Sequence, residues 1–266
     1  TSATTATSAT TTSTSATTTS TSAPPDTTTS PSTTSTPSPA TTTTRPAWWR
    51  EVTPDAPLRL WIIGDSLVPF VGNALRALGE SSGLVRVSVE AHGGTGLARP
   101  DVFDWPAFID SNPPPFAPDV IVILLGANDG QGLASPRGWL AFGTPEWEAG
   151  YAALVAGLTG QLLALSSRVY WVGLPIMGSP DYDSRMRHIS RIAREQAALR
   201  LEARFIEAYS VLQADDGGFA VELPDAEGNL VAVRSTDGIH LSAAGGERLA
   251  RRIMEELEAD CGLVKG

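Results

Sequence analysis

Three short polar segments, each next to an apolar run of the chain, contain side chains that could together carry out acyl transfer. They are Gly64-Asp65-Ser66, Gly126-Ala127-Asn128-Asp129 and Asp237-Gly238-Ile239-His240. A serine hydroxyl becomes a nucleophile when a neighbouring base takes its proton, and histidine is the most frequent such base. A carboxylate can orient the imidazole, and a carboxamide N–H can stabilise an oxyanion. These residue types therefore indicate a serine acyl-transfer site.

Each segment also has an ordinary structural interpretation when it is taken alone. Ser66 follows an apolar run and an aspartate, a pattern that exposes a nucleophile at a strand-to-helix turn but is also a common helix cap. Asn128 could donate to an oxyanion or form an Asx turn. The three-residue separation of Asp237 and His240 is the stronger signal, because a turn can bring the carboxylate beside the imidazole. The alternative is a capping aspartate followed by an incidental histidine.

The two remaining histidines are expected to have structural roles. His188 lies in an arginine-rich amphipathic segment without an acidic partner that the pattern fixes, and His92 borders the glycine-rich segment 93–96. No three-ligand grouping of histidines and carboxylates occurs at useful spacing. We therefore predict no metal site and no cofactor.

The apolar patterns predict the elements that must position these side chains. Strands are expected at 58–63, 84–89, 119–125, 169–175 and 204–206, and a hairpin within 219–233. Helices are expected at 67–78, 144–165, 183–201 and 242–257. Strands that alternate with helices indicate an α/β fold with a mainly parallel sheet. Such folds gather their chemistry at the carboxyl ends of the strands, where two of the polar segments directly follow predicted strands.

The composition divides the chain into two parts. Residues 1–45 are almost wholly Thr, Ser, Ala and Pro, with Asp26 and Arg45 as the only charges. Such a stretch buries too little apolar surface to offset its ordering entropy. We predict a disordered linker over residues 1–50, either O-glycosylated or an unmodified spacer, and one globular domain over residues 51–266.

Charge, cysteine content and apolar run length limit the binding partners and structural features that the chain can have. The net charge is −10 and no basic cluster occurs, which argues against nucleic acid as a partner. Cys261 is the only cysteine, so an intrachain disulfide is excluded. No apolar stretch approaches the ~18–20 residues needed to span a bilayer. Because the chain begins at Thr1 with a Thr/Ser-rich segment, we expect that it belonged to a longer protein with a secretion signal, a membrane anchor or a membrane acyltransferase upstream.

The combination and order of the segments resemble the SGNH hydrolases, also called GDSL-type lipases and esterases. The resemblance covers nearly all of residues 58–257 and implies a three-layer α/β/α sandwich with a flavodoxin-like, mainly parallel five-stranded sheet. It also implies that Ser66 is the nucleophile, His240 the general base and Asp237 the acid that orients it. The backbone N–H of Ser66, a loop glycine and the Asn128 side chain would then form the oxyanion hole.

The resemblance extends to an uncharacterised bacterial subgroup through the stretch Thr95-Gly96-Leu97-Ala98-Arg99-Pro100-Asp101. This favours Gly96 as the oxyanion-hole glycine, with Gly94 as the alternative. The family implies an extracytoplasmic serine esterase that acts on small acyl esters, in particular O-acetyl groups of envelope or exported glycans. The alternatives are an O-acyltransferase that moves an acetyl group to a glycan, and a noncatalytic carbohydrate-binding or scaffold domain. Segment 131–144, with Trp139 and Phe142, is expected to shape the acceptor pocket or to pack structurally.

Overall fold

A five-stranded parallel sheet forms the centre of the domain, in the order β2-β1-β3-β6-β7. The computed structural model describes residues 50–136 and 138–263. The strands are β1 (Leu58–Gly64), β2 (Val85–Ala91), β3 (Val120–Leu124), β6 (Arg168–Val172) and β7 (Ala203–Ile206). Every residue of β3 and β6 is buried, as expected of parallel strands that are covered on both faces.

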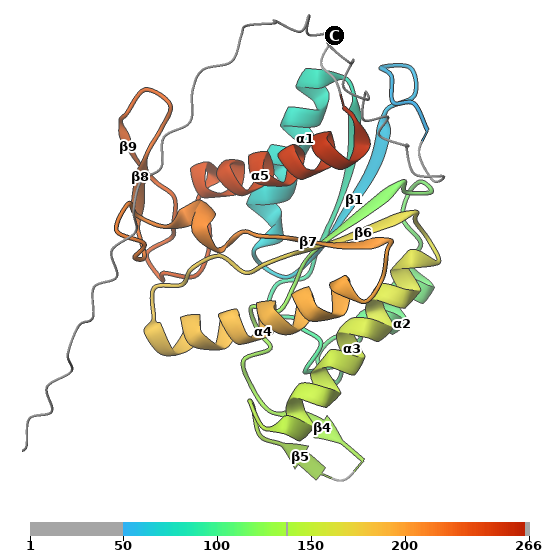
Figure 1. Ribbon diagram of the computed structural model, residues 1–266, viewed down its shortest axis with the longest axis vertical. Coiled ribbons are helices and arrows are strands. Elements are labelled where there is room, and N and C mark those ends of the chain that lie inside the picture. Colours follow the sequence, from blue (N-terminus) through green and yellow to red (C-terminus); the bar gives the residue numbers. More distant parts are fainter. Residues whose placement is uncertain (1–49, 137, 264–266) are drawn as a thin grey trace, which may run out of the picture. The chain divides into compact units, whose positions relative to one another are not determined.

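Helices cover both faces of this sheet (Figure 1). On one side lie α1 (Val68–Ser82) and α5 (Ala243–Cys261). On the other side lie α2 (Trp105–Ser111), α3 (Pro145–Leu163) and α4 (Pro180–Ala198). The predicted three-layer α/β/α fold with a five-stranded parallel sheet is thereby confirmed.

Side-chain caps explain where the helices begin. Thr144 Oγ1 accepts a hydrogen bond from the backbone N–H of Trp147 at 3.3 Å, and proline occupies the first turn of α3. Ser242 Oγ accepts from Gly245 N at 3.1 Å at the start of α5. Both helices were expected to begin at these positions, 144 and 242. Helix α4 begins three residues earlier than predicted, at Pro180, because proline is favoured in a first turn.

The sequence patterns missed one short helix and one hairpin. Helix α2 has 7 residues, and the β4 (Leu133–Ser135) and β5 (Gly138–Leu140) strands of one hairpin have 3 residues each. Elements of this length contain too few repeats to establish a period. The predicted second hairpin is present as β8 (Glu222–Pro224) and β9 (Leu230–Ala232), and a short 3₁₀ helix covers Tyr209–Leu212.

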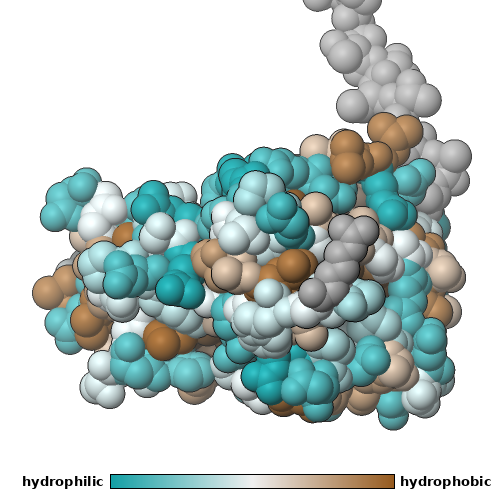
Figure 2. All heavy atoms as spheres, turned by 90° about the horizontal axis from the view of Figure 1, so that it is seen from below, coloured by the Kyte–Doolittle hydropathy of each residue, from teal (hydrophilic) through white to brown (hydrophobic). Residues whose placement is uncertain are grey.

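Contacts at the start of the described chain show where the folded domain is already formed. Arg50, the last residue of the predicted linker, pairs with Asp119 at 2.6 Å just before β3. The rest of that linker lies outside the described residues, so its disorder remains a prediction. Among residues 50–136 and 138–263, no helix combines the length and the apolarity that crossing a bilayer requires. On the face shown in Figure 2, hydrophobic residues are scattered among hydrophilic ones.

Candidate active site

The structure brings Ser66, His240 and Asp237 into one chain of contacts. Ser66 lies between β1 and α1, whereas the other two residues lie in the turn before α5. Ser66 Oγ is 2.9 Å from His240 Nε2, and His240 Nδ1 is 2.6 Å from Asp237 Oδ2. An imidazole that donates from Nδ1 to the carboxylate presents an unprotonated Nε2 to the hydroxyl. This arrangement can remove a proton from Ser66.

The Asp237 carboxylate is held within its own turn. Asp237 Oδ1 accepts hydrogen bonds from the backbone N–H groups of Ile239 at 2.8 Å and of His240 at 3.0 Å. The hydrogen bond from the His240 side chain and these two backbone donors lower the pKa of Asp237 to about 2. The carboxylate is therefore ionised at neutral pH and can stabilise a protonated imidazole.

Two glycines allow this turn to approach the loop that follows β6. Gly178 N–H donates to Gly238 O at 2.9 Å. A Cβ atom on Gly178 would lie 3.1 Å from the Cα of Gly238, and Gly238 has a φ of +71°. A larger side chain at either position would push the turn that carries His240 away from the sheet.

Arg234 supports the same turn through hydrogen bonds to its backbone. Its side chain is buried, with 3 % of the residue exposed, and Nη1 donates to Ile239 O at 2.6 Å. Nη2 donates to the carbonyl of Ile176, so one guanidinium links the histidine turn to the loop after β6. Burial lowers the pKa of Arg234 to about 10, which leaves it charged at neutral pH.

Ser66 and the glycine-rich segment 93–96 contain hydrogen-bond donors without a protein partner. Within the part of the chain that the structure describes, the backbone N–H groups of Ser66, Gly93, Gly94 and Gly96 donate to no protein acceptor. The carboxamide of Asn128 uses one N–H on Thr95 O at 2.9 Å, which fixes its orientation. Donors that lack a partner in the free protein are suited to an oxyanion that appears during a reaction.

The glycines of segment 93–96 occupy different environments. A Cβ on Gly96 would lie 2.1 Å from Asp129 Oδ1, so a carboxylate occupies the space that a larger residue would need. Gly94 has a φ of +75° and no heavy atom near its Cβ direction. Gly93, to which the sequence analysis assigned no role, would place a Cβ 3.7 Å from that of Ser66. Gly93 therefore faces Ser66, whereas Gly96 faces Asp129.

Two buried carboxylates are next to Ser66 and Asn128 in the chain. Asp65 and Asp129 each have 0 % of their surface exposed, and both belong to the polar segments that first drew attention to the site. Burial raises the pKa of Asp65 to about 6 and also raises that of Asp129. Sequence reasoning gave neither residue a role, although an aspartate at the end of an apolar run was the available signal.

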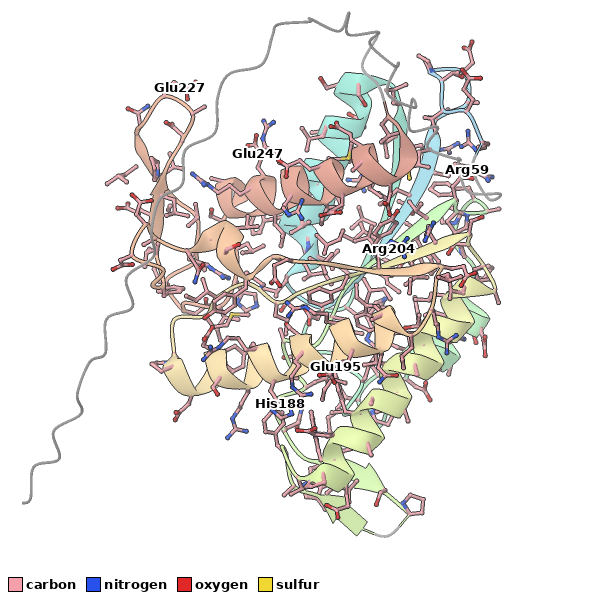
Figure 3. All side chains as sticks on the ribbon, in the orientation of Figure 1. Arg59, His188, Glu195, Arg204, Glu227 and Glu247 are labelled. Atoms are coloured by element: carbon pink, nitrogen blue, oxygen red, sulfur yellow. The ribbon has the colours of Figure 1, made fainter. Side chains whose placement is uncertain are left out.

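The other two histidines lie in structural environments. His92 stacks on Phe103 with ring centroids 4.3 Å apart, and its Nε2 lies 2.7 Å from Glu90 Oε1. His188 on α4 points toward α3 (Figure 3), where its Nε2 lies 2.9 Å from Glu148 Oε1. The sequence pattern did not reveal that acidic partner. Among the described residues, no group of three or more metal-ligating side chains is close enough to hold an ion.

The aromatic residues of segment 131–144 divide into one packed and one exposed ring. Phe142 packs on Trp147 with ring centroids 4.5 Å apart. Trp139 on β5 is 62 % exposed, although the sequence analysis treated the two alike. Its indole nitrogen would lie 2.1 Å from a Cβ on Gly132, so glycine lets the ring lie against a backbone four residues beyond Asn128.

Comparisons with known proteins show the fold and the family of the chain. The chain resembles solved structures described as an alpha/beta hydrolase enzyme, LAE5, from the metagenome of Lake Arreo and as a catalytic mutant of Axe2, an acetylxylan esterase from Geobacillus stearothermophilus. LAE5 has 17 % identity over 79 % of this chain and 97 % of its own, with a TM-score of 0.52. Axe2 has 17 % identity over 75 % and 94 %, with a TM-score of 0.51.

These likenesses confirm the predicted resemblance to SGNH hydrolases at the level of the fold. The family model described as "Protein of unknown function (DUF459)" matches residues 59–256, and the chain belongs to that family. No curated protein matches the sequence.

Proposed function

We propose that this protein is a serine esterase that cleaves small acyl esters through a covalent acyl-enzyme. The observation that carries the proposal is the continuous set of contacts from Ser66 through His240 to Asp237. A binding module needs no such set, because recognition alone requires neither a nucleophile nor a base. The unpaired N–H groups of Ser66 and of the glycine-rich segment support the same function, since an oxyanion needs donors that have no other partner.

The reaction begins when Ser66 Oγ attacks the ester carbonyl carbon and its proton passes to His240 Nε2. The former carbonyl oxygen carries the negative charge and accepts hydrogen bonds from Ser66 N–H, Asn128 Nδ2 and the glycine-rich segment. When the tetrahedral intermediate collapses, the carbon–oxygen bond to the alcohol breaks and His240 returns the proton to the leaving oxygen. Water then attacks the acyl carbon and gives a proton to His240. The bond between that carbon and Ser66 Oγ breaks, His240 returns the proton to Ser66 Oγ, and the acid is released.

For the substrate we propose an O-acetyl group on an envelope or exported glycan, which would place the protein outside the cytoplasm. The side chains of His240 and Asp237 are 43 % and 45 % exposed, so the site is open enough for an ester that is part of a larger molecule. The fold neighbour Axe2 is described as an acetylxylan esterase. Gly93 joins Gly96 and Gly94 as a donor for the oxyanion, because it faces Ser66.

Two measurements on one pair of variants test the proposal. Ser66→Ala should abolish labelling by a fluorophosphonate probe and hydrolysis of p-nitrophenyl acetate, while the thermal unfolding midpoint stays unchanged. Loss of a nucleophile typically lowers kcat by about 10⁶-fold. Ser81→Ala, which changes an exposed serine near the end of α1, is the matched control and should behave like the unmodified protein. Equal labelling of Ser66→Ala and the unmodified protein would reject the serine mechanism.

A panel of acetylated oligosaccharides, with and without an unacetylated acceptor sugar, then identifies the reaction. Release of acetate regardless of acceptor is the expected result for an esterase. Acetate transfer that depends on the acceptor would instead identify an O-acyltransferase. Binding without any turnover or labelling would identify a carbohydrate-binding domain.

A further inference from the structure

Asp65 connects the nucleophile loop to the loop that carries Asn128. Its Oδ1 accepts a hydrogen bond from Leu67 N at 3.0 Å, immediately after Ser66. Its Oδ2 accepts from Gly126 N at 3.1 Å and from Ala127 N at 2.9 Å, immediately before Asn128. The carboxylate therefore holds two oxyanion donors, the backbone of Ser66 and the side chain of Asn128, at a defined separation.

Asp129 connects the Asn128 loop to the glycine-rich segment. Its Oδ2 accepts from Leu97 N at 2.9 Å, and its Oδ1 accepts from Ala98 N at 2.8 Å. The absence of a side chain at Gly96 lets the carboxylate approach this backbone. Tyr151 on α3 donates its hydroxyl to Oδ2 at 2.8 Å and so fixes the carboxylate from the helix side.

Both carboxylates are surrounded by donors, which favours their ionised form. Each receives three hydrogen bonds, and an ionised carboxylate can only accept. A protonated carboxyl group would turn one O–H toward an N–H or a hydroxyl that already donates. An isolated buried charge is costly, but three donors offset much of the cost. Apolar residues could fill the same space, yet they could not orient backbone N–H groups.

We propose that Asp65 and Asp129 are positioning residues that cross-link the three loops of the oxyanion hole and hold its donors at the separation the transition state requires. This proposal rests on the proposed esterase function. Neither carboxylate touches the substrate. Their effect on the reaction passes through Ser66 N–H, the glycine-rich segment and the Asn128 carboxamide, whose misplacement by about 1 Å can cost about 10²-fold in rate.

Asp129→Asn is the most direct test. The best fit puts the new amide nitrogen in place of Oδ1, where it faces the N–H of Ala98, while the bonds from Leu97 and Tyr151 remain. We expect kcat for p-nitrophenyl acetate to fall about 10²-fold with KM unchanged. Asp101→Asn is the matched control, because Asp101 follows the same loop with a 65 % exposed side chain. It should leave kcat unchanged.

A tetrahedral inhibitor separates positioning from loss of fold. A trifluoromethyl ketone forms an oxyanion adduct with the serine, so its inhibition constant should rise in Asp129→Asn by the same factor by which kcat falls. Tyr151→Phe removes one donor and keeps the carboxylate. In this variant the inhibition constant should also rise by the factor by which kcat falls, and that factor should be about a tenth of the one in Asp129→Asn. Unchanged inhibition in a folded Asp129→Asn variant of low kcat would overturn the proposal.

A double-mutant cycle gives the second test. In an Asn128→Ala background, Asp129→Asn should lower kcat by much less than it does alone, because the donor that it positions is already absent. Fully additive effects would reject the positioning role while leaving the esterase intact. If the unmodified protein hydrolyses no ester and Ser66 is not labelled, the proposed function itself is wrong. The two failures are therefore distinguishable.

Discussion

The two sides of the candidate site are held by opposite chemistry. On the oxyanion side, the buried acids Asp65 and Asp129 accept hydrogen bonds from backbone N–H groups. On the histidine side, the buried base Arg234 donates to the backbone carbonyls of Ile176 and Ile239. An acceptor orders N–H groups and a donor orders C=O groups. Each loop is therefore held by the type of side chain that matches the backbone group it must satisfy.

The supports also differ from the reacting groups in burial. Asp65 and Asp129 are fully buried, whereas the side chains of Asp237 and His240 are more than two-fifths exposed. Substitution of a buried supporting residue changes the free energy of unfolding strongly, because water cannot replace the lost partner. The supporting carboxylates are therefore closed to water, while the face that would meet the substrate stays open.

Among substitutions that leave Ser66 in place, the largest effect is expected on the oxyanion side. Asn128→Ala removes the carboxamide donor and should lower kcat about 10²–10³-fold with little change in KM, because the lost hydrogen bond forms mainly in the transition state. Steady-state kinetics on p-nitrophenyl acetate measure both constants. A variant that changes KM alone would show that Asn128 only binds the ground state.

As the pH falls, the carboxylate of Asp65 on the oxyanion side should become protonated before the carboxylate of Asp237 on the histidine side. The pKa of Asp65 is about 6 and that of Asp237 about 2, so only Asp65 takes up a proton as the pH falls through 6. The charged or titratable groups that act on Asp65 are Asp129, Tyr151 and Tyr182. Because the raised pKa means that the folded state binds this proton more tightly, Asp65 itself stabilises folding more at pH 5 than at pH 7.

As the pH falls from 7 to 5, activity should therefore decrease while the contribution of Asp65 to folding stability increases. Between pH 7 and 5, kcat/KM should fall as Asp65 takes up its proton, because the protonated carboxyl group no longer accepts all the hydrogen bonds that hold the oxyanion donors. Asp65→Asn should make the slope of that fall shallower, at a lower overall rate. Chemical denaturation at each pH checks that the protein is still folded. An unchanged slope in the Asp65→Asn variant would show that protonation of Asp65 does not cause the loss of activity at low pH.

A smaller effect on rate is expected on the histidine side. Arg234→Met leaves the carbonyls of Ile176 and Ile239 without their buried donor, which should lower the free energy of unfolding by about 2–3 kcal/mol. The loss of kcat should be about 10-fold, because the Asp237 turn retains its own backbone hydrogen bonds. Urea unfolding and kinetics on the same preparation measure the two effects. A free energy of unfolding that stays unchanged in Arg234→Met would show that Arg234 does not support the His240 turn as the buried carboxylates support the oxyanion side.

The smallest effect should appear only with large substrates. Four residues of chain span at most about 14 Å, so Trp139 beside Gly132 lies within reach of a glycan bound near Asn128. Trp139→Ala should raise KM for an acetylated oligosaccharide about threefold, a loss typical of one exposed aromatic contact, and leave p-nitrophenyl acetate hydrolysis unchanged. Leu199→Ala, at a 75 % exposed apolar residue after α4, is the control. Identical KM values for all three proteins would show that Trp139 makes no substrate contact.

Much of the fold could be predicted because the main strands and helices are long enough to show their period. β3 appears as a nearly continuous apolar run, and α3 begins at a threonine followed by proline. Helix α2 and the β4–β5 hairpin were missed because each is shorter than two full periods of its pattern. The distinction between Phe142 and Trp139 was also out of reach, since it depends on Trp147 in another element.

The kinds of candidate catalytic residues, their order and their placement after strands could be predicted from the sequence, because local apolar patterns and short motifs carry that information. The motifs predicted that Ser66, His240 and Asp237 belong to one site. The groups that hold them there could be identified only in the folded chain. Arg234 meets the His240 turn, and Asp129 meets the Gly96 backbone, through contacts between segments that no local pattern relates. Such contacts depend on which loops the sheet order brings together, and that order is a property of the folded chain.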